Sequence, residues 1–283
     1  MLKSLLKQIT VYAVQNDFVW AILKQTLLRA ASYANHAREI GMVNVQGGLK
    51  ILGAVKQISP DLTVMHGPFQ GMQYPTAQSI GSMLTPKLLG SYEHELESVI
   101  EKICTTAYSE IIDIGCAEGY YAVGLARRIR SAKIYAYDIN PIAIRLCKEM
   151  AQRNQVSDRV FTGTHCDAHT LAQLPTQRAL ILCDCEGCEK IIFTPELISQ
   201  LARHDLLVEI HDYVHIETSA LLRYRFQTTH SILAIPSLDD IAKARAYVYP
   251  ELNGYSLAAR KILLAENRPH IMEWFFMTPR VSA

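Results

Sequence analysis

The chain has 283 residues, with 28 basic and 27 acidic side chains and a formal net charge of +1. Apolar residues make up 49% and charged residues 19% of it, which excludes an intrinsically disordered chain. The balanced charge argues against a dedicated nucleic-acid binder, because such proteins carry a basic excess. The length is enough for one large domain or two small ones, each with a buried core.

The first 104 residues predict a mainly helical region. Apolar residues recur at three- and four-residue spacing over 18–34 and again over 92–103. Between these helices, residues 62–75 place Gly67-Pro68 and Gly71 between β-prone ends, which predicts a short hairpin or an ordered loop. We expect this region to pack on the rest of the chain and cover its functional site. Its apolar helices are also compatible with an interface between two copies of the chain, as in a homodimer.

Three features bear on the compartment. The longest N-terminal apolar run, residues 18–23, is six residues long, far short of the ~20 that cross a bilayer. Residues 1–9 lack the long apolar block and the cleavage site of a secretory signal. The seven cysteines are odd in number and fall mostly in predicted strands, helices and strand-end loops, which favours reduced thiols over a disulfide framework. We therefore expect a cytoplasmic protein without a membrane span.

From residue 105 to 283 the chain alternates strand and helix patterns. Short apolar strands bounded by turn residues are predicted at 110–115, 133–138, 159–163, 179–184, 206–211, 231–235 and 271–277. Helices are predicted at 120–130, 141–154 and 195–203, and a helical insertion near 237–268. Strands buried on both faces and separated by helices are typical of an α/β fold with a doubly wound, mostly parallel sheet, here of seven strands.

In such a sheet, ligands bind beyond the carboxyl ends of the strands. The first strand leads into Asp113-Ile-Gly-Cys-Ala-Glu-Gly119, whose glycines allow a tight turn at the start of a helix. After the second strand, Asp138 can accept both hydroxyls of an adenosine ribose. After the third, Asp167-Ala168 offers an acceptor and a backbone donor to an adenine edge. Each of these residues could instead close a turn or cap a helix, but their joint occurrence at consecutive strand ends favours a nucleoside site.

The glycine turn does not fit a dinucleotide. Gly-x-Gly-x-x-Gly is required there, but Ala117 replaces the second glycine and Tyr120 the third. The spacing Asp-x-Gly-x-x-x-Gly, with acids after the next two strands, instead resembles the S-adenosylmethionine (SAM) site of class I methyltransferases.

The fourth and fifth strand ends narrow this resemblance. Asp184-Cys-Glu-Gly-Cys-Glu189, followed by Glu209-Ile-His211, is similar to the Asp-x-Glu-Gly-x-Glu signature and the next strand end of the FkbM family of SAM-dependent methyltransferases. The resemblance covers about residues 90–235 and implies O-methylation of a hydroxyl on a sugar, polyketide or other small metabolite. The residues assigned to the cofactor, by this resemblance and by their places at the strand ends, are Glu93, Asp113, Gly115, Cys116, Ala117, Glu118, Gly119, Tyr120, Asp138, Ile139, Asp167, Ala168, Asp184 and Glu186.

Methyl transfer to a hydroxyl needs alignment of the acceptor and removal of its proton. His211 is the candidate general base, and Asp184 and Glu209 are candidate catalytic neighbours. Together with Glu186, these residues could also hold Mg²⁺ or Mn²⁺, which would orient the acceptor oxygen. A zinc site at Cys183, Cys185 and Cys188 is disfavoured, since a second cysteine pair is lacking. Transfer to nitrogen or carbon, or SAM binding without catalysis, remain as alternatives.

Overall fold

The structure is a computed structural model that describes residues 55, 57–173, 177–266 and 268–280. The chain divides into two compact units, residues 1–54 and 55–283, and every described residue belongs to the second unit. The helical interpretation of residues 18–34 therefore lies outside the described residues.

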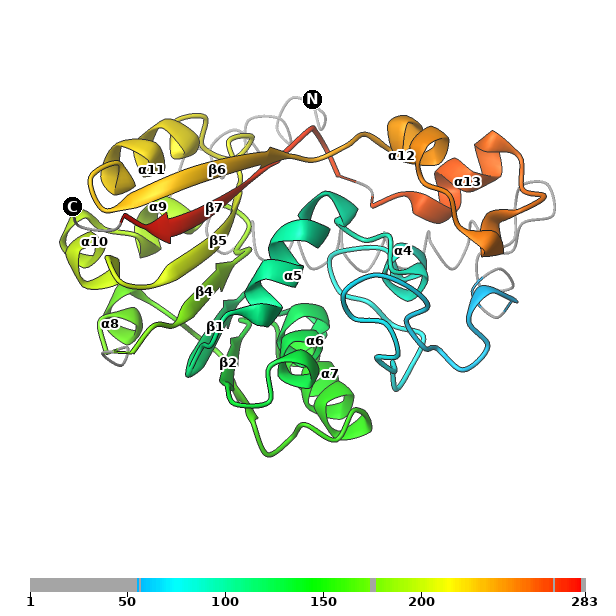
Figure 1. Ribbon diagram of the computed structural model, residues 1–283, viewed down its shortest axis with the longest axis horizontal. Helices are drawn as coiled ribbons and strands as arrows, with labels where there is room; N and C mark the ends of the chain where they lie inside the picture. The colour runs from blue at the N-terminus through cyan, green and yellow to red at the C-terminus, as the bar shows by residue number, and fades with distance from the viewer. Residues whose placement is uncertain (1–54, 56, 174–176, 267, 281–283) are drawn as a thin grey trace, which may run out of the picture. The chain divides into compact units, whose positions relative to one another are not determined.

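The second unit is built on one seven-stranded sheet (Figure 1). Its spatial order is β3-β2-β1-β4-β5-β7-β6, and only β7 runs antiparallel to its neighbours β5 and β6. The doubly wound, mostly parallel sheet predicted from the sequence is confirmed. The strands are β1 (Glu110–Ile114), β2 (Lys133–Tyr137), β3 (Val160–Gly163), β4 (Leu180–Cys183), β5 (Asp205–Ile210), β6 (His230–Pro236) and β7 (Glu273–Pro279).

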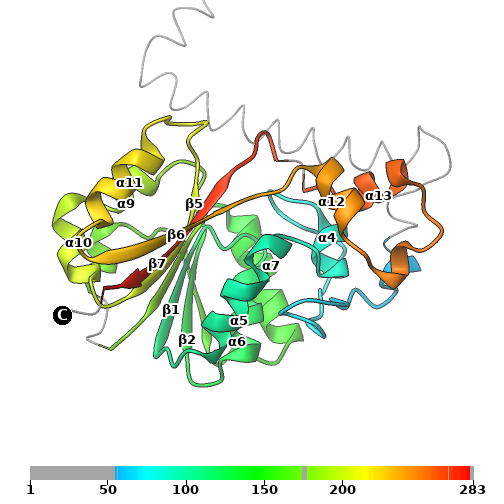
Figure 2. The ribbon, with the colours of Figure 1, turned by 45° about the horizontal axis from the view of Figure 1, so that its top comes forward.

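Helices cover both faces of the sheet (Figure 2). The face that carries Leu180 and Leu182 packs against α5, α6 and α7, while Ile181 and Cys183 point to the opposite core under α9, α10 and α11. This alternation explains why the strands read as continuous apolar runs: a strand buried on both sides has no solvent face to mark with polar residues. The helices of these layers are α5 (Glu97–Thr105), α6 (Tyr120–Arg128), α7 (Pro141–Arg153), α8 (Ala168–Leu171), α9 (Glu189–Ile192), α10 (Pro195–Leu201) and α11 (Thr218–Phe226).

The segment between β6 and β7, where the sequence predicts a helical insertion, is helical over part of its length. It contains α12 (Asp240–Ala246), the 3₁₀ helix η2 (Pro250–Leu252) and α13 (Leu257–Leu264). Asp239 caps α12 by accepting hydrogen bonds from two main-chain N–H groups, and Ser256 caps α13 in the same way with one bond. The insertion places Glu266 and Arg268 near the start of β7.

The segment before β1 folds around the predicted loop at residues 62–75. Thr63 and Gln73 form an antiparallel bridge, and the Val64 N–H donates to the Met72 carbonyl over 2.8 Å. The side chains of Phe69 and Met72 are buried in the core of the α5–α7 face. Three short helices lie between this loop and β1: α4 (Leu84–Leu89), η1 (His94–Leu96) and α5. The predicted hairpin or loop is thus closed by one bridge, and its apolar side chains belong to the core.

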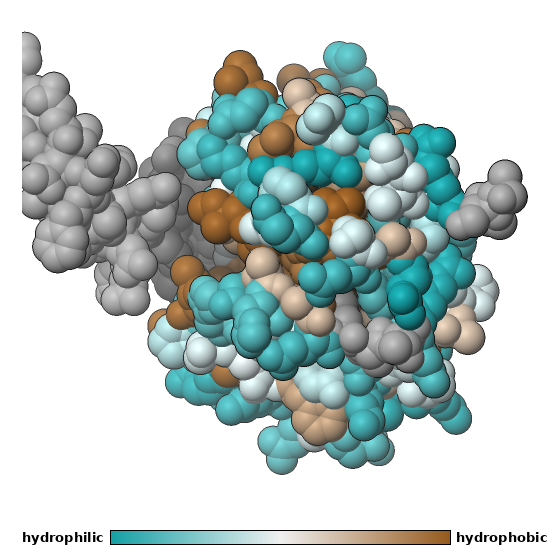
Figure 3. Space-filling view, turned by 90° about the vertical axis from the view of Figure 1, so that its left-hand side faces the viewer, coloured by the Kyte–Doolittle hydropathy of each residue, from teal (hydrophilic) through white to brown (hydrophobic). Residues whose placement is uncertain are grey.

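The surface of the second unit mixes hydrophilic and apolar residues, as Figure 3 shows for the side that carries α8 to α11. Among the described helices, none combines the length and the apolar character needed to cross a membrane.

Candidate functional site

The loop after β1 is a tight turn that only glycine can form at residue 115. Gly115 has a φ of +85°, and a Cβ there would lie 1.7 Å from the Asp184 carbonyl oxygen. The N–H groups of Gly115 and Cys116 both donate to the Tyr137 carbonyl, over 2.8 and 3.0 Å. The loops after β1, β2 and β4 are thus pressed together at the carboxyl ends of the strands, where a sheet of this kind binds its ligand.

Asp138 joins the ends of β1 and β2. One carboxylate oxygen accepts a hydrogen bond from the Ala117 N–H over 2.9 Å, and the other accepts from the Asn140 N–H over 2.7 Å. Asn140 in turn caps α7, which begins at Pro141 as predicted. The Asp138 side chain stays half-exposed at the predicted ribose position.

Asp113 lies beneath the glycine turn and is the least satisfied acid of this region. It is 1% exposed, and neither carboxylate oxygen has a hydrogen-bond partner. Burial, followed by the nearby charge of Asp138, raises the pKa of Asp113 to about 7. A carboxyl group held in this way is stabilised by an added cation or a proton.

Glu118, assigned to the cofactor on sequence grounds, directs its carboxylate elsewhere. It accepts hydrogen bonds from Lys87 Nζ (2.6 Å), Ser79 Oγ (3.0 Å) and the Ile80 N–H (2.9 Å), and from the Tyr74 hydroxyl. Lys87 and Glu118 are both buried. The side chain thus fastens the segment before α4 to the glycine turn, and only its backbone is left for a ligand. A lysine inside the apolar helix α4 was the sequence signal for this pair.

The remaining cofactor candidates lie along the same edge. Asp167 caps α8 by accepting from the Thr170 N–H over 2.8 Å, and Ala168 is the first residue of that helix. Ile139 is 76% exposed, although it is apolar. Tyr120 is buried at the start of α6. An exposed isoleucine beside Asp138 offers an apolar surface on which a flat ring can lie.

His211 stands at the end of β5 and is 1% exposed. Its Nδ1 lies 2.6 Å from Glu189 Oε1, and Glu189 is completely buried. Because a carboxylate accepts hydrogen bonds, this contact places a proton on Nδ1 and leaves Nε2 as the reactive nitrogen. Nε2 has no hydrogen-bond partner among the described residues.

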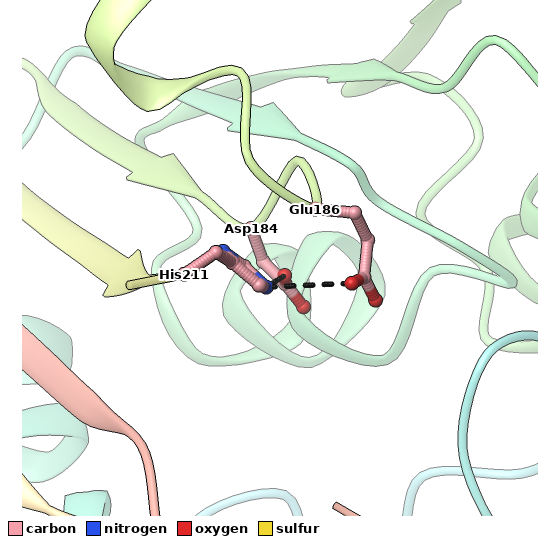
Figure 4. A group of neighbouring side chains, drawn as sticks. All are labelled: Asp184, Glu186 and His211. Carbon is pink, nitrogen blue, oxygen red and sulfur yellow. Dashed lines mark ion pairs between the residues drawn. The ribbon is translucent and has the colours of Figure 1, made fainter. Parts of the chain in front are cut away.

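Three further carboxylates surround Nε2. Figure 4 shows two of them, Asp184 and Glu186, beside the imidazole. Asp184 and Glu186 come from the loop after β4, at 3.5 Å each, and Glu209 comes from β5, at 3.4 Å. Burial lowers the pKa of His211, but the bond to Glu189 and the charge of Glu209 outweigh it, so the pKa is raised. Burial raises the pKa of Asp184 to about 7 and that of Glu209 well above its usual value.

A partly buried cation balances some of the negative charge of these acids. The Arg268 guanidinium, from the segment after α13, donates to Glu209, Glu93 and Glu266. Glu93 also accepts from the Tyr121 hydroxyl, and burial raises its pKa to about 7. A narrow pocket runs between Tyr92, Glu93 and Tyr121. Arg268 was not identified from the sequence, because its partners lie up to 175 residues away along the chain.

The cysteines of the loop after β4 correct one prediction. Cys185 and Cys188 form a disulfide, so the expectation of reduced thiols is wrong for this pair. Among the described residues, the free cysteines are Cys104, Cys116, Cys147, Cys166 and Cys183. Two residues separate the bonded pair, and the turn at Glu186-Gly187 brings their Cα atoms to 5.6 Å, within the normal range for a disulfide. An odd number of cysteines argues against a complete disulfide framework but does not exclude one local disulfide, here Cys185–Cys188.

Three side chains at this edge fit a divalent cation. One ligand atom from each of Asp184, Glu186 and His211 lies within 4.8 Å of the others. Asp184 Oδ1 and His211 Nε2 are buried without hydrogen-bond partners. An oxygen-rich set with one imidazole suits Mg²⁺ or Mn²⁺. Glu209, the fourth predicted metal candidate, instead accepts from Arg268.

This strand order, with an antiparallel seventh strand inserted beside β5 and a glycine turn after β1, defines the class I methyltransferase fold. Residues 106–205 match the family model described as a methyltransferase domain. This part of the chain is therefore similar to methyltransferase domains. The description of this family model is general, and the match does not show that the chain belongs to the FkbM family.

Curated relatives share short segments. The chain is 34% identical over 65 residues to a release factor glutamine methyltransferase of Dictyoglomus turgidum, covering 23% of each chain. It is 27% identical over 113 residues to a ribosomal protein L11 methyltransferase of Pelobacter propionicus, covering 40% of this chain and 35% of that one. The matched segments thus span 23% to 35% of the length of these relatives.

Solved structures resemble the chain at low identity. A putative O-methyltransferase from Klebsiella pneumoniae has a TM-score of 0.44 at 10% identity, with 88% of this chain and 97% of that one covered. A SAM-dependent methyltransferase from Geobacter sulfurreducens, in complex with S-adenosyl-L-homocysteine, has a TM-score of 0.42 at 15% identity, with 66% and 91% covered.

Proposed function

We propose that the protein is a SAM-dependent methyltransferase that methylates a hydroxyl group on a small molecule such as a sugar or a polyketide. The observation that carries this proposal is the order of side chains along one sheet edge. Asp138 lies on one side of the glycine turn, and Asp184 and His211 lie at the next two strand ends on the other. The resemblance of the Asp184–Glu189 segment to the FkbM family supports the same acceptor class.

The first half of this edge suits the methyl donor. The half-exposed carboxylate of Asp138 would accept the ribose hydroxyls, Ile139 would lie against the adenine, and Asp167-Ala168 would meet the adenine edge. The unsatisfied carboxyl of Asp113 beneath Gly115 favours a ligand that brings positive charge to the turn. SAM would supply a methyl group already activated on a sulfonium, together with that charge.

The second half suits an acceptor hydroxyl. Glu189 holds the proton of His211 on Nδ1, so Nε2 can take the acceptor proton as the new O–CH₃ bond forms. Because the pKa of His211 is raised, the unprotonated base becomes more abundant as the pH rises through this pKa. Turnover should therefore increase with pH until His211 is deprotonated and then level off.

A divalent ion is a second means of activating the acceptor. Asp184, Glu186 and His211 would hold Mg²⁺ or Mn²⁺, which would lower the pKa of a coordinated hydroxyl. In that case Nε2 is a ligand, and another group must accept the proton. Turnover in excess EDTA, followed by addition of each metal, separates the two routes: full activity in EDTA contradicts the metal route.

The proposal is tested by SAM calorimetry and by S-adenosylhomocysteine release across a panel of hydroxyl, amine and carbon acceptors. We expect His211→Ala to retain SAM affinity and to lose turnover by about 10²-fold or more, as removal of a general base does. His215→Ala, four residues further along the chain, is the matched control. Binding of SAM without turnover on any acceptor would favour a SAM-binding protein that does not catalyse methyl transfer. Product from amines alone would replace O-methylation by N-methylation.

A further inference from the structure

The loop after β4 brings a cysteine pair into the wall of the His211 site. Cys185 and Cys188 bracket Glu186 and Gly187, which have φ values of +56° and +102°. The left-handed conformation is unfavourable for glutamate, so the cross-link between the flanking cysteines helps to hold it. A Cβ on Gly187 would lie 2.8 Å from a Val214 side-chain carbon, which shows how closely the loop packs on the chain after β5.

One carboxylate oxygen connects the disulfide to the imidazole. Glu189 Oε1 lies 3.6 Å from Cys185 Sγ, 3.1 Å from the Gly187 nitrogen and 2.6 Å from His211 Nδ1. In the disulfide, Cys185 Sγ carries no proton, so Glu189 Oε1 accepts from Gly187 and His211 alone. Glu189 Oε2 is buried without a hydrogen-bond partner.

Reduction would change this balance directly. A reduced Cys185 gains an S–H group 3.6 Å from Glu189 Oε1, where it competes with the Gly187 N–H and His211 Nδ1 for that oxygen. At the same time the ring that closes Cys185 to Cys188 opens, and Glu186 is released to leave the left-handed region. Both changes weaken the hold of Glu189 on His211 Nδ1 and move Glu186 relative to Nε2.

We propose that Cys185 and Cys188 are a reversible thiol–disulfide modification site whose oxidation state sets the position of Glu189 and the His211 imidazole. In the disulfide form, Glu189 and the His211 imidazole are held in the positions described above. Reduction by a small dithiol weakens this arrangement. The consequence for turnover rests on the proposed methyltransferase function, whereas the thiol chemistry does not.

The exchange is confined to this pair. Cys185 and Cys188 are half-buried and thus within reach of a small dithiol, whereas Cys183 is fully buried. Cys183 Sγ lies 3.6 Å from Cys185 Sγ, but burial raises the pKa of its thiol, so it stays protonated and is a poor nucleophile. A thiolate of the dithiol attacks one sulfur, giving a mixed disulfide, and its second thiolate displaces the protein sulfur. The pair gains two electrons and two protons, and the dithiol leaves as a cyclic disulfide.

The test uses the full chain in buffers with stepped ratios of reduced to oxidised dithiothreitol. Aliquots are alkylated with iodoacetamide and digested, and the mass of the peptide that contains residues 183–188 is measured by mass spectrometry. Histidine ring NMR signals are recorded at fixed pH, with His211 assigned from H211N. We expect Cys185 and Cys188 to be labelled together and the His211 signals to move with the same midpoint, reversibly. The C185S/C188S variant should show the reduced spectrum at every ratio, and C104S should keep the transition.

The outcomes are separable. A pair that resists excess dithiothreitol under native conditions, or reduction that leaves the His211 signals unchanged, overturns the proposal. If the His211 signals of the wild-type protein return on reoxidation, the test does not depend on whether the C185S/C188S variant folds. Turnover should fall several-fold with the same midpoint, and equal turnover in both states contradicts the effect on catalysis. Absence of methyl transfer in every redox state contradicts the proposed function only, because labelling and NMR need neither SAM nor an acceptor.

Discussion

Replacing Asp113 by asparagine should stabilise the empty protein and weaken its binding of SAM. The side chain is buried, both carboxylate oxygens lack hydrogen-bond partners, and burial raises its pKa from 3.8 to about 7. A raised pKa means that the folded state favours the protonated form. The carboxyl therefore costs little stability below pH 3.8, and the cost grows as the pH rises and stops growing above pH 7.

The size of the effect follows from this pKa. One pKa unit corresponds to about 1.4 kcal/mol, so the ionisable group costs about 2 kcal/mol at pH 5 and about 4 kcal/mol at pH 8. The asparagine of D113N keeps the shape of the side chain but cannot ionise, and it should recover most of this free energy. The gain should therefore double between the two pH values.

The assay is urea unfolding of D113N and wild type at pH 5 and pH 8, followed by SAM calorimetry at pH 8. The positive charge of bound SAM favours an ionised Asp113, so we expect the dissociation constant of D113N to rise about tenfold, equivalent to about 1.4 kcal/mol. D158N, on an exposed side chain, should change neither quantity. A stability difference that is the same at both pH values would refute the electrostatic argument, and unchanged SAM affinity would remove Asp113 from the cofactor site.

Three other substitutions test the glycine turn, the Lys87–Glu118 pair and the buried histidine that precedes β5. G115A should lose several kcal/mol of unfolding free energy by chemical denaturation, because its Cβ would collide with a main-chain oxygen at 1.7 Å, whereas G254A, at a similar φ of +84° with open space, should lose only about 1 kcal/mol. K87M should cost about 3–5 kcal/mol by leaving the buried Glu118 charge unpaired, and K87M/E118Q should recover part of it in the same urea assay. Burial lowers the pKa of His204 to about 4, so the contribution of this residue to stability should fall by up to about 3 kcal/mol from pH 6.5 to pH 4, and H204N should gain stability relative to wild type over that range in pH-dependent melting.

The sequence predicted the sheet because its strands are buried on both faces and its helices are amphipathic, patterns that neighbouring residues produce together. It also predicted which residues meet at the sheet edge, because parallel strands present their carboxyl ends on the same side. Asp138 and His211 reach that edge from different strand ends for this reason. Their assigned chemical roles stay predictions.

The partners of these residues could not be predicted in the same way. Lys87 meets Glu118 across 31 residues, and Arg268 meets Glu93 across 175, through packing that no local pattern records. Glu189 was visible as part of a signature, but its contact with Nδ1 depends on the turn at Gly187. Single-sequence patterns report local periodicity and turns, whereas these ion pairs depend on how distant segments dock.

The surplus of negative charge around His211 links proton, metal and cofactor binding at this site. Four carboxylates face the imidazole, and among the described residues Arg268 is the guanidinium that reaches one of them, Glu209. Such a surplus can be relieved by protons, by a divalent ion or by a cationic ligand. Protons leave as the pH rises, so proton relief predicts that Mg²⁺ binding strengthens from pH 6 to pH 8 and releases protons on calorimetry in buffers of different ionisation enthalpy. If the sulfonium of SAM relieves the charge instead, SAM affinity should rise from pH 6 to pH 8 with no added metal. Measuring Mg²⁺ affinity and SAM affinity over this pH range therefore distinguishes relief by the metal from relief by the cofactor.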